Sequence, residues 1–252
     1  MPQSLEKDLQ TLADARVFFG HQSVGKNIIA GIEELSGDYQ EIDLNITGNS
    51  TEVGGTSCCL LHTAVGKNTD PLSKCVDFGR ILDQQLIGKI DYALLKFCYI
   101  DINRDSDVTK LFEDFKRTMD DLIDRHPEIT FIHATVPLRH SPGGLGVWIR
   151  ELLGRPNNSK LDNIKRNQFN HLLRTHYTQS PIVDIAASES TYPDGKRETF
   201  KMDGQTYYSL IGEYTDDGGH LNENGRRRVA SAFVRELAQI IRNHPRIDPG
   251  RA

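Results

Sequence analysis

The sequence predicts an α/β fold in which a parallel sheet of five strands carries helices on both faces. Short apolar runs typical of buried strands alternate with helical stripes five times along the 252 residues. Such alternation is typical of βαβ units, whose strands run parallel. The chain also lacks a linker rich in Pro or Ser and any visible internal repeat. We therefore expect residues 1–252 to form one domain.

Hydrophobic spacing in the first half of the chain predicts three helices and two strands. In order, these are a helix carrying Leu5, Leu9 and Leu12, a strand over residues 16–19, a helix from Val24 to Leu35, a strand over 42–46, and a helix opened by Asp70-Pro71. Apolar residues three or four apart indicate the helices, and alternation indicates the strand over 42–46. Asp70 is suited to cap its helix, and proline to the first helical position. Residues 47–69 are rich in Gly, Ser and Thr and predict a long loop.

The second half of the chain continues the alternation. Its predicted elements are strands over residues 92–98, 129–136 and 182–185, helices over 108–123, 160–177 and 229–241, a loop over 138–160, and a hairpin with a tight turn at 202–205. The helix over 108–123 has the clearest apolar stripe. Asp203-Gly204 is a dipeptide that tight hairpin turns favour.

The charge balance excludes several classes of partner. The chain has 30 Lys and Arg residues against 35 Asp and Glu residues, a net charge of −5. Without basic runs, this balance argues against nucleic acid or an anionic membrane as the main partner. No apolar run approaches the length of a membrane-spanning helix. The sequence leaves the oligomeric state open.

The N-terminus and the cysteines bear on the compartment. The opening residues, MPQSLEKDLQ, lack the basic region and apolar run of a signal peptide. We therefore expect a cytoplasmic protein, or an exported one if a leader has been removed. The four cysteines are too few for a disulfide scaffold and include no C-x-x-C pair, which argues against zinc and thioredoxin-type chemistry. We expect no metal site and no cofactor.

Function is expected at one edge of the sheet, because ligands of open parallel sheets bind at the carboxyl ends of the strands. The unusual segments of the chain follow predicted strands: residues 20–27, the loop up to residue 70, residues 99–105, the glycine-rich loop around Trp148, and the stretch before the last helix. Long loops of this kind in a compact domain are usually functional.

The segment after the first strand allows competing hypotheses. Residues 20–27 read Gly-His-Gln-Ser-Val-Gly-Lys-Asn, which has the glycine and lysine spacing of a phosphate-binding loop. Asn27 stands where that loop needs a hydroxyl to ligate magnesium, so a nucleotide-binding enzyme of this type is the weaker hypothesis. In the other, Ser23 is a nucleophile at a helix start, where its own N–H and the helix dipole can stabilise an oxyanion. Ser23 as a simple helix cap is the third possibility.

A second motif, just before the last helix, favours the nucleophile. Residues 217–225 read Asp-Gly-Gly-His-Leu-Asn-Glu-Asn-Gly. Two glycines allow the Asp217 carboxylate to fold back onto the His220 imidazole. The carboxylate would then orient the ring, and its other nitrogen would take the proton of a serine hydroxyl. Asn222 is a candidate cap for the helix that follows.

In these two motifs the chain resembles the SGNH (GDSL-type) hydrolases, which are esterases and acyl-ester hydrolases. The resemblance rests on Phe19-Gly20-His21-Gln22-Ser23 and on the residues from Asp217 to Gly225. The Gln22-Ser23 pair looks more like the carbohydrate acetylesterase branch than like the Gly-Asp-Ser lipases. The resemblance implies a three-layer α/β/α sandwich with a flavodoxin-like five-stranded parallel sheet, and Ser23, His220 and Asp217 as a catalytic triad.

The middle of the chain departs from the pattern of this family, which places a Gly after the second strand and an Asn after the third as oxyanion donors. After residue 98 only Asp101 matches, without the Gly or the Asn. In the long loop, Gly66 and Asn68 are candidates to supply a backbone N–H and a side-chain amide, beside the N–H of Ser23. A missing donor would cost about 10²–10³ in rate.

Five further residues are candidates for contact with substrate: His21, Lys26, Lys67, Asp101 and Trp148. The two lysines would suit an anionic group, and the tryptophan a sugar ring. We expect a serine esterase that hydrolyses, or transfers, a small acyl group on a carbohydrate or similar polar alcohol. The alternative from another class is a catalytically idle glycan or nucleotide binder on the same fold, which the missing oxyanion residues suggest.

Overall fold

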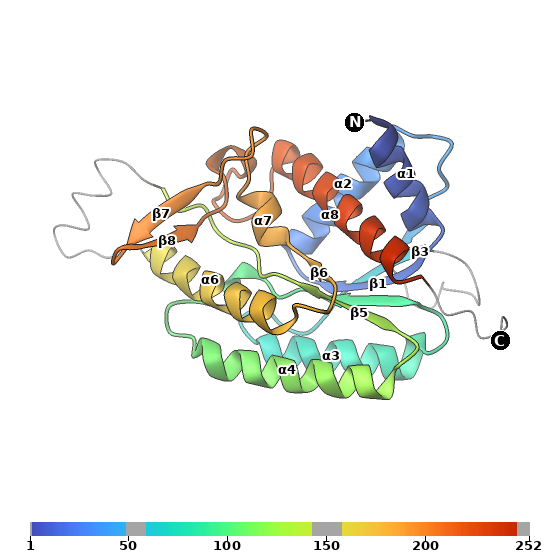
Figure 1. Cartoon of the computed structure of the whole chain (residues 1–252), viewed down its shortest axis with the longest axis horizontal. Helices are drawn as coiled ribbons and strands as arrows, with labels where there is room; N and C mark the ends of the chain where they lie inside the picture. The colour runs from blue at the N-terminus through green and yellow to red at the C-terminus, as the bar shows by residue number, and fades with distance from the viewer. Residues whose placement is uncertain (1, 49–58, 143–157, 246–252) are drawn as a thin grey trace.

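The computed structural model describes residues 2–48, 59–142 and 158–245. Its main sheet is parallel and has the strand order β2-β3-β1-β4-β5-β6 (Figure 1). These strands are β1 (Arg16–His21), β2 (Ile46–Thr47), β3 (Cys59–Ala64), β4 (Tyr92–Leu95), β5 (Thr130–Ala134) and β6 (Ile182–Val183). A separate antiparallel hairpin joins β7 (Thr199–Met202) to β8 (Gln205–Tyr208). The predicted α/β fold with a parallel sheet is confirmed.

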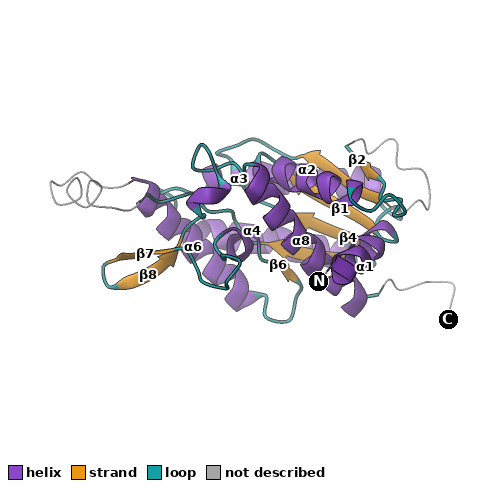
Figure 2. Ribbon diagram, turned by 90° about the horizontal axis from the view of Figure 1, so that it is seen from above, coloured by secondary structure: helices purple, strands orange, loops and turns teal. Residues whose placement is uncertain are grey.

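Helices cover both faces of the sheet, as expected. They are α1 (Pro2–Ala13), α2 (Val24–Gly37), α3 (Pro71–Ile81), α4 (Val108–Arg125), α6 (Asn158–His176), α7 (Ile185–Glu189) and α8 (Glu223–Asn243), with short 3₁₀ turns at Tyr99–Asp101 and Gly212–Tyr214 and a π-helical turn at Leu82–Leu86. Helices α1, α2 and α8 pack together on one face, and α3, α4 and α6 on the other. Figure 1 shows α3 and α4 beneath the sheet and α8 above it. Figure 2, which is seen from above, shows α2 and α8 over the strands.

The central strand β1 serves both layers of the core. Val17 and Phe19 face the cluster formed with α1, α2 and α8, whereas Phe18 faces the cluster formed with α3 and α4. All three side chains are fully buried. Alternate residues of a strand point to opposite faces, so a continuous apolar run is what a strand covered on both sides requires.

The strand count and one strand position were wrong. Within the described residues the sheet has six strands rather than five, because β3 lies within residues 47–69, which we expected to be a loop. Its apolar signal is short, since His62 and Thr63 follow Leu60 and Leu61 directly. The strand expected over 42–46 is reduced to β2, at Ile46–Thr47, because the Leu44 N–H donates to the Ile42 carbonyl in a turn that interrupts the extended chain.

The local signals for turns and caps were read correctly. The Asp70 carboxylate accepts a hydrogen bond from the Ser73 N–H (3.1 Å) at the start of α3. Asn222 accepts one from the Gly225 N–H (3.0 Å) at the start of α8. Asp203 and Gly204 both have positive φ in the hairpin turn, which is the conformation that a two-residue hairpin loop requires.

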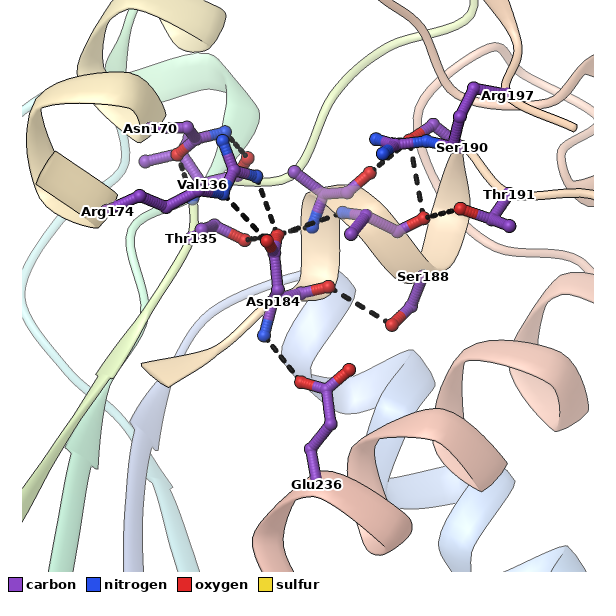
Figure 3. Close-up of polar contacts among 12 residues, drawn as sticks. Thr135, Val136, Asn170, Arg174, Asp184, Ser188, Ser190, Thr191, Arg197 and Glu236 are labelled. Carbon is purple, nitrogen blue, oxygen red and sulfur yellow. Dashed lines mark hydrogen bonds and ion pairs between the residues drawn. The ribbon is translucent and has the colours of Figure 1, made fainter. Parts of the chain in front are cut away.

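A polar network around Asp184 holds together the elements at the β6 edge of the sheet (Figure 3). Asp184 follows β6 and caps α7, accepting from the Ala187 N–H and the Thr135 hydroxyl, each at 3.0 Å. The guanidinium of Arg174, on α6, reaches both carboxylate oxygens at 2.7 Å. The Asp184 N–H donates to Glu236 on α8 at 2.6 Å. The Asp184 carboxylate therefore joins α6 and α7 to the residue that follows β5, and the Asp184 N–H adds α8.

The buried acidic residue at the end of α7 gives a prediction for stability. Glu189 is fully buried and accepts a hydrogen bond from the Leu138 N–H, while its other oxygen has no partner among the described residues. Burial raises the pKa of Glu189 from 4.5 to about 8. Between these values the unfolded chain has released the proton and the folded chain still holds it. Stability therefore falls as pH rises, by about 1.4 kcal/mol per pH unit for an ideal group.

Glu189→Gln is expected to remove this slope. Its free energy of unfolding should gain on that of the wild type steadily from pH 5 to pH 8, because glutamine carries no proton to lose. Urea denaturation at pH 5, 6.5 and 8 measures the difference. Glu236, whose pKa burial raises to about 7, is present in both proteins and cancels. Two curves that stay parallel over this range would contradict the assignment.

Candidate active site

Ser23 lies in a two-residue connection between β1 and α2, since β1 ends at His21 and α2 begins at Val24. Its φ of 45° and ψ of −105° lie outside the favoured regions for a residue with a side chain. Its hydroxyl makes no capping hydrogen bond to the helix, which contradicts the simple cap. A strained serine at a sharp strand-to-helix turn is the arrangement that presents a hydroxyl at the edge of a sheet.

The same geometry contradicts the phosphate-binding loop. Gly20 is part of β1, and Gly25 and Lys26 are part of α2, so the chain forms no wide loop of N–H groups around an anion. Asn27, which did not fit that motif, has another task. Its side-chain oxygen accepts a hydrogen bond from the Leu221 N–H (3.3 Å) and so ties α2 to the segment that carries His220.

The three residues expected to form a triad lie together although 197 residues separate the first from the last. The Ser23 hydroxyl is 2.9 Å from Nε2 of His220. The other ring nitrogen, Nδ1, is 2.6 Å from a carboxylate oxygen of Asp217. Hydroxyl, imidazole and carboxylate therefore form one hydrogen-bonded line, which is the arrangement that activates a serine.

The Asp217 carboxylate is engaged through both oxygens. One faces His220, and the other accepts from the N–H groups of Gly219 and His220, each at 2.8 Å. The hydrogen bond from the His220 ring, joined by those from the two N–H groups, holds the pKa of Asp217 well below its usual range. Its side chain is 56% exposed and that of His220 is 44% exposed, so the pair lies at the rim and is reached by water.

The loop that carries the pair is held from the next segment along the sheet edge. Arg139 donates to the carbonyls of Asp217 and Gly218, each at 3.2 Å, and the His140 N–H donates to that of Gly218 at 2.9 Å. Asn163 on α6 in turn accepts from the Arg139 N–H (2.9 Å). Arg139 is a positioning residue that the sequence did not single out.

The loop after β3 contacts the segment just before Ser23 because β3 is the neighbour of β1. The Gln22 side-chain amide donates to the carbonyls of Val65 (3.2 Å) and Gly66 (3.0 Å). Gly66 has a φ of +55°, and a side chain there would collide with the backbone of Lys74. Glycine is therefore needed at this position to let the loop fold against α3.

The prediction that Gly66 donates to the oxyanion was wrong for this structure. Its N–H already donates to the Asp77 carboxylate (3.0 Å). The next N–H, that of Lys67, donates to the Ser73 hydroxyl (2.9 Å). Asn68 differs, because its side-chain oxygen accepts from the Lys74 ammonium (3.1 Å) while its amide N–H₂ is left to other partners. Asn68 and the Ser23 N–H stay predictions as oxyanion donors.

The predictions that His21 and Asp101 contact the substrate were wrong, because both residues are buried. His21 is 1% exposed, and its Nε2 is 3.0 Å from Nδ1 of His62. Asp101 is 5% exposed and forms an ion pair with Lys74 at 2.5 Å, with both side chains fully buried. It also accepts from the N–H groups of Cys98 (2.6 Å) and Thr69 (2.9 Å). Asp101 therefore joins the loops after β3 and β4.

The other candidates for substrate contact stay predictions. Lys26, in the first turn of α2, and Lys67 are exposed. Trp148 lies outside the described residues. Tyr99, which the sequence did not single out, has its hydroxyl 3.4 Å from Nε2 of His220. The only available signal was its position directly after the strand predicted over residues 92–98.

No group of three or more His, Cys, Asp and Glu side chains among the described residues is placed to hold a metal ion. No helix among them combines the length and the apolar character that crossing a membrane would require.

No protein-family model matches the chain, and no curated protein does. Solved structures resemble it at low identity. The lipase/acylhydrolase from Enterococcus faecalis is 15% identical at a TM-score of 0.45, over 89% of this chain and 96% of that one. The acetyl xylan esterase AlAXEase is 14% identical at 0.45, over 86% and 96%. A catalytic mutant of the acetylxylan esterase Axe2 from Geobacillus stearothermophilus is 13% identical at 0.42, over 88% and 92%.

The solved structures that resemble this chain include proteins named as a lipase/acylhydrolase, a lipolytic protein of the G-D-S-L family, an SGNH hydrolase and acetylxylan esterases.

Proposed function

We propose that this protein is a serine esterase that hydrolyses, or transfers, a small acyl group on a carbohydrate or similar polar alcohol. The observation that carries the proposal is the hydrogen-bonded line from the Ser23 hydroxyl through the His220 imidazole to the Asp217 carboxylate, at 2.9 and 2.6 Å. A serine alone is a weak nucleophile, and a base at this distance is what activates it.

The reaction follows from the placement of these atoms. The Ser23 oxygen forms a bond to the ester carbonyl carbon as its proton passes to Nε2 of His220, and the carbonyl π electrons move to the oxygen. When the carbonyl re-forms, the carbon–oxygen bond to the alcohol breaks and the alcohol leaves with the proton from Nε2. Water, or a second alcohol, then attacks the acyl carbon as its proton passes to Nε2 of His220. When the carbonyl re-forms, the bond to the Ser23 oxygen breaks, the acid or the new ester leaves, and Ser23 takes its proton back from Nε2. Asp217 stays charged and stabilises the imidazolium.

The start of α2 supports the step in which negative charge builds up. Ser23 precedes the first residue of the helix, so its N–H lies at the positive end of the helix dipole. A backbone donor aimed at a developing oxyanion is commonly worth about 3–4 kcal/mol in the barrier. The Ser23 N–H is therefore proposed as the first oxyanion donor.

The substrate class is proposed from the rim of the site. Lys26 lies in the helix that follows Ser23, Lys67 lies in the loop after β3, and both are exposed. The Asp217–His220 pair is open to water. Such a rim suits an ester of a polar alcohol better than an ester with a long acyl chain. The Gln22-Ser23 pair, which resembles carbohydrate acetylesterases, favours a small acyl group.

Turnover of a matched ester series tests the proposal. We expect 4-nitrophenyl acetate to be cleaved with a higher kcat/KM than 4-nitrophenyl octanoate, and acetate to be released from an acetylated monosaccharide. Added glycerol would reveal transfer as an acetylated glycerol product. A preference for the octanoate would overturn the small acyl group, and no turnover of any ester by folded protein would overturn the esterase. Asp217→Asn, which leaves a bond to the ring but removes the charge, is the matched control.

A further inference from the structure

The hydroxyl of Tyr99 contacts the nitrogen that takes the serine proton. It lies 3.4 Å from Nε2 of His220, and the same nitrogen is 2.9 Å from the Ser23 hydroxyl. The phenol and imidazole rings meet edge to face, with centroids 5.7 Å apart. Two oxygens from distant parts of the chain therefore share one imidazole nitrogen, and only one of them is explained by the triad.

The fold fixes this tyrosine on several sides. Arg139 and Arg166 place their guanidinium carbons 5.4 and 5.8 Å from the centre of its ring. The Arg166 side chain also donates to the Tyr99 carbonyl at 2.7 Å. A side chain on Gly219 would approach the Tyr99 hydroxyl end to 2.9 Å. Two cations near the ring and the backbone beside His220 therefore restrain Tyr99, which preorganises its hydroxyl.

The hydroxyl keeps its proton at neutral pH. Burial raises the pKa of Tyr99 above 10, with the nearby Asp217 charge acting in the same direction against the opposing charge of Arg139. The group is consequently a neutral hydrogen-bond donor throughout the range in which an esterase works. The hydroxyl can donate one hydrogen bond, and its polar contact among the described residues is Nε2 of His220.

We propose that Tyr99 is a catalytic residue whose phenolic O–H donates a hydrogen bond to the oxyanion formed when Ser23 attacks the ester. This rests on the proposed esterase function. In this role Tyr99 supplies a hydrogen-bond donor that the loop after β3 does not. The N–H groups of Gly66 and Lys67 in that loop already donate to Asp77 and Ser73.

The order of proton transfers makes the Tyr99 hydroxyl available in the transition state rather than in the ground state. Before attack, Nε2 of His220 is an acceptor and competes for the Tyr99 proton. After it takes the serine proton, Nε2 becomes a donor and no longer accepts from the phenol. The Tyr99 proton is then free for the carbonyl oxygen, which has gained the negative charge. The phenolic O–H bond stays intact throughout. A contact made only after charge has moved lowers the barrier rather than the ground state.

Tyr99→Phe tests this proposal, because phenylalanine keeps the ring beside the two arginines and removes only the hydroxyl. We expect kcat/KM for 4-nitrophenyl acetate to fall by about 10²–10³, with an unchanged pH–rate profile and an unchanged melting temperature. Butylboronic acid, which forms a tetrahedral adduct with a serine nucleophile, should bind more weakly by a similar factor. Tyr207→Phe, whose hydroxyl contacts Gln205 in the hairpin, is the control and should keep full activity.

Other results would overturn the role. A kcat/KM within threefold of the wild type would show that the hydroxyl does not stabilise the oxyanion. A fall accompanied by a shifted acid limb of the pH profile, with boronate affinity unchanged, would show that Tyr99 acts only by positioning His220. A wild type that cleaves no ester fails at an earlier point, because it removes the proposed function and this role together.

Discussion

Ser23→Ala is expected to lower kcat for 4-nitrophenyl acetate by about 10⁴–10⁶, since removing the nucleophile of a triad costs nearly as much as removing all three members. The protein should stay folded, because the Ser23 hydroxyl makes no capping bond and its one described partner is His220. Steady-state kinetics with circular dichroism as the control measures both. A variant that retains more than a tenth of the activity would exclude Ser23 as the nucleophile.

Ser23→Gly separates activity from backbone strain. Glycine adopts positive φ without the cost that a side chain incurs, and a residue held in such a conformation stores about 1–3 kcal/mol. We therefore expect Ser23→Gly to be as inactive as the alanine variant but more stable than it by about 1 kcal/mol in urea denaturation. Equal stabilities would mean that the turn is not strained at this residue.

Asp101→Ala is expected to destabilise the protein by about 3–5 kcal/mol, which is the cost of leaving a buried charge without its partner. Lys74 is fully buried, and Asp101 is its ion-pair partner at 2.5 Å. The substitution also removes the acceptor for the N–H groups of Cys98 and Thr69. Urea denaturation measures the loss, and low expression of folded protein is its expected sign.

A double variant provides the control for this pair. Lys74→Met with Asp101→Leu removes both charges together, and replacing a buried ion pair by apolar groups is often neutral. We expect the double variant to recover much of the stability that Asp101→Ala loses. A stability of Asp101→Ala equal to that of the wild type would contradict the role of this ion pair in the fold.

The parts of the fold that the sequence predicted are those with strong local signals. The stripe over residues 108–123, the Asp70 cap and the Asp203-Gly204 turn each depend on neighbouring residues alone, and the structure has all three. Strand β3 was missed because its identity depends on pairing with β1, more than 40 residues earlier in the chain. Its four polar and apolar residues from Leu60 to Thr63 do not distinguish a buried strand from a loop.

In the candidate site too, the contacts that neighbouring residues determine were predicted, and those that depend on packing were not. Asp217 and His220 are three residues apart, and their contact follows from the two glycines between them. That contact and the one to Ser23 were expected, and the structure brings the three together. The commitment of the Gly66 N–H to Asp77 and the burial of Asp101 against Lys74 depend on how α3 packs. Position along the chain alone therefore suggested the wrong roles for Gly66 and Asp101.

Covalent labelling tests the central claim most directly. A fluorophosphonate reacts only with a serine whose hydroxyl is activated by a neighbouring base. After incubation of the intact protein, we expect one added phosphonyl group, located by peptide mass spectrometry at Ser23, and no label in His220→Ala. A folded protein that takes up no label, or that carries it at a different serine, would contradict the account.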